Sequence, residues 1–180
     1  MSLWQVQSQN FRIGSRLAYL AAGIAAFVAS YSAGAFGVQL TAEEAQTTVD
    51  EFTASVEDIE EGGIFSNNVL IALGMFIPAA GVGLGMYAGV STGIVFNAFV
   101  HVVPNLAGVS PLSVFATPFG ILELFAYGLG ISRSGILTYD LIKRRPWRQY
   151  LVMTLIEIAI AIAALLIGSY VEGQFIENAQ

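Results

Sequence analysis

The feature that most constrains the fold is a series of long apolar segments. They cover residues 17–38, 64–87, 93–106, 112–131 and 149–170, and most are near the length of about 20 residues that a helix needs to cross a bilayer. Only 11% of the chain is charged, whereas soluble domains carry about a quarter. We therefore predict an all-α, polytopic fold: one integral membrane domain, residues 1–180, with about five transmembrane helices.

The first and the middle segments need separate comment. Residues 17–38 exceed the roughly 7–15 apolar residues of a signal peptide, so we expect a retained membrane anchor. The segment 93–106 is short, and Pro104, Pro111 and Pro118 each interrupt helical hydrogen bonding. Some of the middle helices are therefore expected to be short, kinked or broken.

The basic residues predict the orientation. Arg12 and Arg16 precede the first segment, and the other five of the seven Lys and Arg residues lie in an inner basic loop, residues 132–148. With five spans both groups fall on one side, which the positive-inside rule makes cytoplasmic. The N-terminus is then cytoplasmic and the C-terminus extracytoplasmic, in a multi-pass protein of the cell membrane. The loop serves either as a simple topology signal or as an interfacial helix that touches anionic headgroups.

The acidic segment 41–61 predicts an amphipathic helix on the outer side. Thr41 and Glu44 form a T-x-x-E capping box, and Gly62–Gly63 suit a helix end. One apolar stripe recurs at helical spacing, and acidic residues occupy much of the remaining surface. The stripe consists of Val49, Phe52, Val56 and Ile59. This helix either lies on its own membrane domain or offers a docking surface to a partner or a second copy.

Glycines spaced by four residues predict close helix packing. Gly81, Gly85 and Gly89 form a doubled G-x-x-x-G pattern. In a bilayer, small residues let helix backbones approach each other and so replace the missing hydrophobic drive. The contact is either within one chain or between two copies, which leaves a homodimer open.

Polar residues inside the apolar segments are the candidate site. Intramembrane ionisable groups usually face the bundle interior or a cavity, because they are costly in lipid. The predicted polar cluster consists of Glu123, His101, Glu157, Asn97, Asn67 and Asn68, and Pro118 with Gly120 forms a predicted helix break beside Glu123. Three roles stay open for Glu123: a structural tie to the broken helix, part of a proton or ion pathway with Glu157 and His101, or part of a ligand pocket.

Composition argues against several functional classes. The chain has no cysteine and a single histidine, so we expect no metal site and no thiolate chemistry. No Ser/His or paired-Asp arrangement and no phosphate-binding loop is present in the sequence, and we expect neither catalysis nor a cofactor. The only basic segment is juxtamembrane, so we expect no nucleic-acid partner. The expected partners are the lipid bilayer and other members of a membrane complex.

Two stretches, 62–85 and 117–135, resemble the stage II sporulation protein M family. The first matches an I-F-x-N-N pattern, an asparagine-bearing span follows it, and the second matches a P-H-G-x-x-E signature in which Phe119 replaces the histidine. The matching residues are Ile64, Phe65, Asn67, Asn68, Asn97, Pro118, Gly120 and Glu123. In spore formers the namesake belongs to a membrane complex that recruits peptidoglycan hydrolases. The resemblance thus implies scaffolding, while the buried carboxylates keep a small transporter, channel or proton-coupled component as the alternative.

Overall fold

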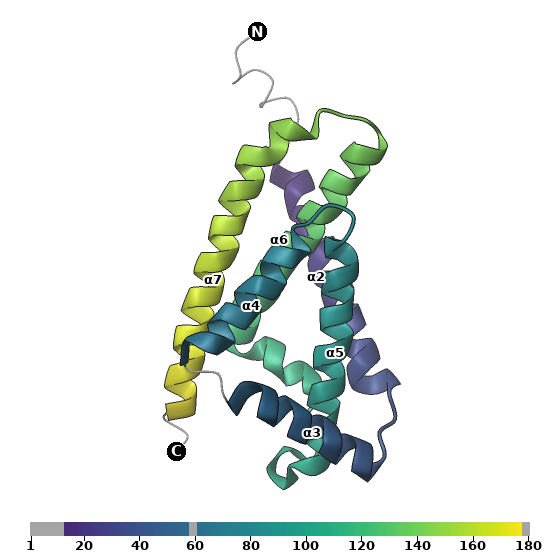
Figure 1. Ribbon diagram of the computed structural model, residues 1–180, viewed down its shortest axis with the longest axis vertical. Coiled ribbons are helices and arrows are strands. Elements are labelled where there is room, and N and C mark those ends of the chain that lie inside the picture. The colour runs from purple at the N-terminus through teal and green to yellow at the C-terminus, as the bar shows by residue number, and fades with distance from the viewer. Residues whose placement is uncertain (1–12, 58–60, 178–180) are drawn as a thin grey trace.

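The computed structural model describes residues 13–57 and 61–177, and all of the regular structure within these ranges is helical. The helices pack side by side along the long axis of the molecule, apart from α3, which lies across one end (Figure 1). The α-helices are α2 (Ile13–Gly37), α3 (Ala42–Glu57), α4 (Glu61–Met75), α5 (Gly81–Val102), α6 (Pro118–Ile142) and α7 (Leu151–Glu177). Three short 3₁₀ helices join them: η1 (Pro104–Leu106), η2 (Pro111–Ala116) and η3 (Trp147–Tyr150).

Helices α2 and α5 touch backbone to backbone through glycine. A Cβ added at Gly93 would lie 2.1 Å from the carbonyl oxygen of Tyr31, and one added at Gly34 would lie 2.1 Å from that of Val90. Gly89 likewise faces Ser30 of α2. The glycines thus bring α5 onto α2 within the same chain, at a distance that any larger residue would increase.

The chain reverses direction between α4 and α5, so the prediction of single spans at 64–87 and 93–106 is wrong. Helix α4 ends at Met75, and α5 begins at Gly81 and continues to Val102. Pro78 cannot donate the next helical hydrogen bond, and Ala79 takes a left-handed backbone conformation with φ of 68°. A Cβ at Gly81 would lie 2.0 Å from the carbonyl oxygen of Met75, so the tight reversal needs glycine there. Hydropathy missed this reversal because its residues are themselves apolar.

Pro118 begins a helix and does not break one. Thr117 is the N-cap of α6: its Oγ1 accepts a hydrogen bond from the backbone N–H of Gly120, 3.0 Å away. Proline suits the first helical position, where the N–H has no intrahelical acceptor. A Cβ at Gly120 would lie 2.0 Å from the carbonyl oxygen of Val114, so this glycine allows η2 to fold back on α6. The predicted helix break at Pro118 and Gly120 is therefore corrected to a helix start.

Helix α6 also extends further than predicted. The predicted span 112–131 and inner loop 132–148 are replaced by η2, by a helix that runs unbroken from Pro118 to Ile142, and by a short connection that ends in η3. Ser132, Arg133 and Ser134 lie in the buried middle of α6. A charge usually marks the end of a predicted span, but Arg133 has its partner, Glu157, inside the protein.

Helix α3 is amphipathic and packs on the end of α5. As the T-x-x-E pattern predicts, the Thr41 backbone N–H and hydroxyl each donate to Glu44 Oε2 at 2.8 Å. Ala45 and Val49 are buried against Ala98 of α5, and the ring of Phe52 contacts that of Phe99 at 5.7 Å.

The predicted helix end at Gly62 and Gly63 is wrong, because both glycines lie in α4. Helix α3 is described as far as Glu57, and residues 58–60 of the predicted range 41–61 lie outside the described residues. Ile59 falls outside the described residues, and the side chain of Val56 is not described.

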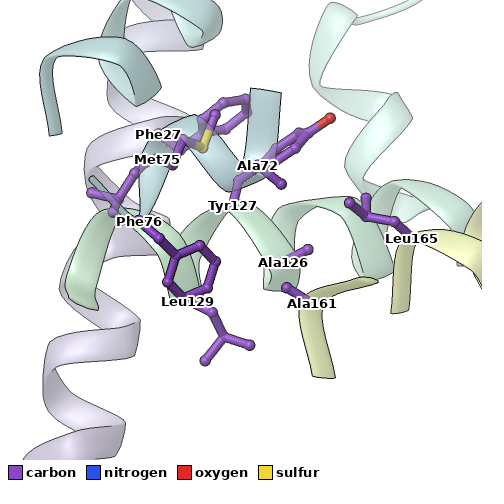
Figure 2. Packing of buried hydrophobic residues seen from close by; sticks show 10 residues of the cluster. Phe27, Ala72, Met75, Phe76, Ala126, Tyr127, Leu129, Ala161 and Leu165 are labelled. Carbon is purple, nitrogen blue, oxygen red and sulfur yellow. The ribbon is translucent and has the colours of Figure 1, made fainter. Parts of the chain in front are cut away.

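The main core lies where α2, α4, α6 and α7 meet (Figure 2). Phe27 of α2 packs its ring 5.1 Å from that of Tyr127 of α6, and Met75 of α4 is fully buried. Small residues bring α6 and α7 together in the same cluster. The clustered residues are Phe27, Ala72, Met75, Phe76, Ala126, Tyr127, Leu129, Ile131, Ala161 and Leu165.

The length and apolar composition of the helices support the interpretation as a membrane protein. Three of them, within residues 14–37, 81–102 and 148–174, are long and apolar enough to cross a bilayer, and 65–75 forms a shorter apolar helix. Large apolar side chains are exposed along α7, among them Val152, Leu155 and Leu166. A soluble monomer rarely leaves so much contiguous apolar surface in water, whereas lipid would cover it.

Candidate functional site

Glu157 of α7 lies between two arginines from two other helices. Arg16 of α2 donates from Nε and Nη2 to the two carboxylate oxygens at 2.6 and 2.8 Å. Arg133 of α6 donates from Nε to Oε2 at 2.7 Å and from Nη2 to Oε1. The Nη1 of Arg16 also donates to Ser132 Oγ at 2.8 Å. We call Arg16, Arg133 and Glu157 the ion triad.

The ion triad is largely buried, and this burial determines how it contributes to the stability of the fold. The side chains of Arg133, Glu157 and Arg16 are 3%, 8% and 12% exposed. Two-pronged guanidinium–carboxylate contacts are among the strongest protein hydrogen bonds. Removing the carboxylate would leave two buried cations facing each other, and breaking a buried pair typically costs about 3–5 kcal/mol. The triad therefore ties α2, α6 and α7 together at one level of the bundle.

Glu123 of α6 has a different environment. Its Oε1 accepts a hydrogen bond from Asn68 Nδ2 of α4 at 2.8 Å. Glu172, near the end of α7, lies within electrostatic range of it. Gly168 packs close to Leu122, which brings this last part of α7 onto the start of α6. Glu123 therefore accepts its hydrogen bond from a neutral amide, whereas Glu157 accepts from two charged guanidinium groups.

Asn97 and His101 form a third group, at the end of α5. The Asn97 side chain is buried and donates from Nδ2 to the carbonyl oxygen of Val38 at 2.8 Å. His101 is exposed, with Nδ1 2.8 Å from the carbonyl oxygen of Asn97, one turn before it. This group satisfies a backbone carbonyl just after α2 ends, where no helical donor remains. Asn67, the remaining residue of the predicted cluster, is exposed on α4.

The structure therefore separates the predicted cluster into three groups. Arg133 follows Glu123 by ten positions in α6, which is about 15 Å at the rise of an α-helix. Within the described residues, Glu157 bonds to arginines, Glu123 to Asn68, and His101 to its own helix. The six residues share no single layer.

Arg16 and Arg133 pair with Glu157, and the sequence did not predict this pairing. Both were assigned to the inner surface because charges usually end a span. A signal for Arg133 existed: apolar residues continue after it through Ile136 and Leu137 to Ile142, at helical spacing. A buried carboxylate such as Glu157 also requires a cation from some neighbouring helix.

Asp140, which the sequence places in the inner loop 132–148, is a further buried charge. It is 3% exposed and lies near the end of α6. Its Oδ1 is 3.6 Å from Nη1 of Arg145, and its backbone carbonyl accepts from the Arg145 N–H at 2.8 Å. This contact folds the α6–α7 connection back onto α6.

The described residues form no metal site, and the comparisons with known proteins found no match. Within residues 13–57 and 61–177, no group of three or more histidines and carboxylates is arranged to hold a metal ion. The resemblance to the stage II sporulation protein M family rests on the short motifs given above. No family model matches the chain, and no curated protein or solved structure shows significant similarity to it.

Proposed function

We propose that this chain is a non-catalytic, multi-pass membrane protein that serves as a subunit or scaffold of a membrane complex. The observation that carries the proposal is the ion triad. It pairs the buried charges Arg133 and Glu157 with each other and with Arg16, in a position that joins three helices. Charges used in this way stabilise an arrangement of helices and are not left available to a moving ion.

The proposed topology has five crossings, by α2, α4, α5, α6 and α7. Helix α4 is only 15 residues long, about 22 Å, so the reversal after it lies within the membrane depth. Irregular backbone is tolerated there only where the protein satisfies it. Ser134 Oγ donates to the carbonyl oxygen of Ile77, and the Ala79 N–H donates to Thr138 Oγ1, both at 2.7 Å. These bonds from α6 suit a reversal inside the bilayer.

The two ends of the bundle carry opposite charges. The α6–α7 connection exposes Lys143, Arg144 and Arg145 at one end, and α3 exposes acidic residues at the other (Figure 1). By the positive-inside rule, the basic end is cytoplasmic, and so is the N-terminus. The C-terminus and α3 are then extracytoplasmic.

A partner or a second copy must use surfaces that the fold leaves open. Gly81, Gly85 and Gly89 are all buried against other parts of the same chain, so this stripe is not offered to a homodimer. The outward face of α3 is exposed and acidic, with Glu43, Asp50 and Glu51 on it. A scaffold role fits this outer helix, and the family resemblance implies the same role.

A second candidate function is proton or ion coupling, and the contact between Glu123 and Asn68 favours it. This carboxyl has a neutral partner and a second carboxyl, Glu172, in electrostatic range. A group of that kind can exchange a proton more readily than one held by two guanidiniums. The candidate requires that Glu123 communicate with both sides of the membrane.

A flux measurement with a matched variant separates the two candidates. The full chain is reconstituted in vesicles with an enclosed pH dye, beside protein-free vesicles and vesicles with Glu123→Gln. The scaffold proposal predicts equal proton leakage in all three under an imposed pH gradient or membrane potential. Leakage above the protein-free level that Glu123→Gln abolishes would contradict it and establish coupling.

Single-cysteine labelling tests the topology in the same preparation. The chain contains no cysteine, so each introduced thiol is unique. Arg144 and Glu51 are both exposed. An impermeant maleimide should therefore label Arg144→Cys and Glu51→Cys from opposite sides of the membrane. Labelling of both from one side would contradict the five-crossing arrangement.

A further inference from the structure

A cavity of about 640 Å³ opens at the basic end of the bundle, beside the ion triad. It lies between α2, α6 and the connection from α6 to α7. Its lining combines three guanidinium groups with hydroxyl and phenol groups. The polar residues of this lining include Arg16, Arg133, Arg145, Asp140, Tyr19 and Tyr139.

The charges around this cavity do not cancel. Three arginines face it, and two carboxylates, Asp140 in the lining and Glu157 behind it, oppose them. One positive charge is therefore left over at the cavity itself. Lys143 and Arg144 are exposed on the same connection and add to the positive potential. A cavity of this kind attracts anions.

Two of the arginines keep donors that the described residues do not use. Arg133 donates from Nε and Nη2 to Glu157, and the described residues supply no acceptor for its Nη1. Arg145 is 55% exposed, and its contact with Asp140 is long, at 3.6 Å. Forked guanidinium groups with free N–H donors match the oxygens of a phosphate.

The surroundings of the cavity suit a ligand that is polar at one end and apolar at the other. Tyr19 and Tyr139 line it and are about half exposed, and tyrosines concentrate at the headgroup level of membrane proteins. Ala22 and Ile136 also belong to the lining, and Leu17 is exposed on the adjoining surface of α2. Acyl chains could cover these apolar groups while the headgroup reaches the arginines.

We propose that this cavity binds a phosphate-bearing anion through Arg145 and Arg133, and that its occupant is the headgroup of an anionic phospholipid. The lipid assignment rests on the membrane placement proposed above. The phosphate chemistry depends only on the guanidinium groups. A bound headgroup would join α2, α6 and the α6–α7 connection at the basic face of the protein.

The test uses Arg145→Gln with Arg144→Gln as its matched control. Both variants remove one exposed positive charge from the same connection, but Arg144 does not line the cavity. The full chain is placed in nanodiscs of phosphatidylcholine with a graded fraction of phosphatidylglycerol. Bound lipid per chain is measured by native mass spectrometry at about 0.15 M salt, where attraction between distant charges is screened.

The first arm measures lipid preference. We expect the unaltered chain to retain phosphatidylglycerol over phosphatidylcholine. Arg145→Gln should weaken that preference about tenfold, as expected for a lost hydrogen bond to a charged group, and Arg144→Gln by about twofold at most. Circular dichroism confirms that both variants remain folded. Equal losses in the two variants would show general surface attraction and overturn the proposal.

The second arm separates a lipid from a soluble anion. In nanodiscs of phosphatidylcholine alone, inorganic phosphate replaces chloride at equal ionic strength, and the shift in Tm is measured. A shift that Arg145→Gln removes, without any lipid preference, would overturn the lipid assignment and establish a soluble phosphate ligand. If the chain shows no lipid preference and phosphate causes no shift in Tm, the proposed site itself is overturned. The proton leakage assay does not involve this cavity, so it reports separately on the proposed function.

Discussion

Two carboxyl groups of this protein, the buried Glu157 and the partly buried Glu123, have opposite surroundings. Glu157, in the first part of α7, accepts from two guanidinium groups on two other helices. Glu123, near the start of α6, accepts from one neutral amide on α4 and has a second carboxyl within electrostatic range. The Glu157 region joins three helices through ion pairs, and the Glu123 region joins two helices through one hydrogen bond from a neutral donor.

The difference shows that a buried carboxyl does not by itself indicate a function. Burying a charge is costly unless it is paired and hydrogen-bonded. Near Glu157 the pairing comes from Arg133, only 3% exposed in its side chain, so the group is committed to structure. Near Glu123 the described residues supply no cation, so that region is where any proton chemistry would have to be sought.

The largest expected effect comes from making the same substitution in the two regions. Glu157→Gln should lower the free energy of unfolding by about 3–5 kcal/mol, because Arg16 and Arg133 then face each other without an anion. The measurement is denaturation in mixed micelles. A loss equal to that of Glu123→Gln would remove the distinction between the two carboxyl groups.

A smaller effect tests whether steric packing, instead of charge, holds the helices. Gly93→Ala places a Cβ 2.1 Å from the carbonyl oxygen of Tyr31, so α2 and α5 must separate. We expect a loss of about 1–3 kcal/mol in the same titration. Gly83→Ala is the control: it lies on the same helix with nothing within 4 Å, and its stability should stay equal or rise slightly. Similar losses in both would show that the contact does not matter.

Contacts between residues close together in the chain could be predicted from the sequence, whereas contacts between distant residues could not. The capping box of Thr41 and Glu44 involves residues three apart, and the structure contains it. The reversal at Pro78 was missed because Phe76 and Ile77 continue the apolar pattern across it. The Glu157 contacts join residues 141 and 24 positions apart, and no local pattern specifies such a pairing.

The next effect is smaller and concerns the Glu123 region. Glu123→Gln keeps an oxygen that can accept from Asn68 and loses no charged partner. We expect a change of less than about 1 kcal/mol, in the range of one neutral hydrogen bond. A loss of several kcal/mol would mean that Glu123 is held as an anion by groups other than Asn68.

The smallest effect lies outside the bundle, at the start of α3. Hydrogen bonds from the Thr41 backbone N–H and then from its hydroxyl hold the pKa of Glu44 below its ordinary value of 4.5. The stabilisation of this helix end is therefore present above about pH 4.5 and is lost as the pH falls through the lower, folded-state pKa. The protection of amide hydrogens in the first turn of α3 from exchange, relative to the intrinsic exchange rate at each pH, should fall over that interval. In Glu44→Gln this pH dependence should vanish, and its persistence would contradict the assignment.

The central claim is that the buried charges of the ion triad hold the helices together, and a double-mutant cycle tests it most directly. Unfolding free energies are compared for the unaltered chain, Arg133→Gln, Glu157→Gln and the double variant. We predict a coupling of about 2–3 kcal/mol, so that the double variant is little less stable than Glu157→Gln alone. Strictly additive losses would show that Arg133 and Glu157 contribute independently, and would contradict the claim.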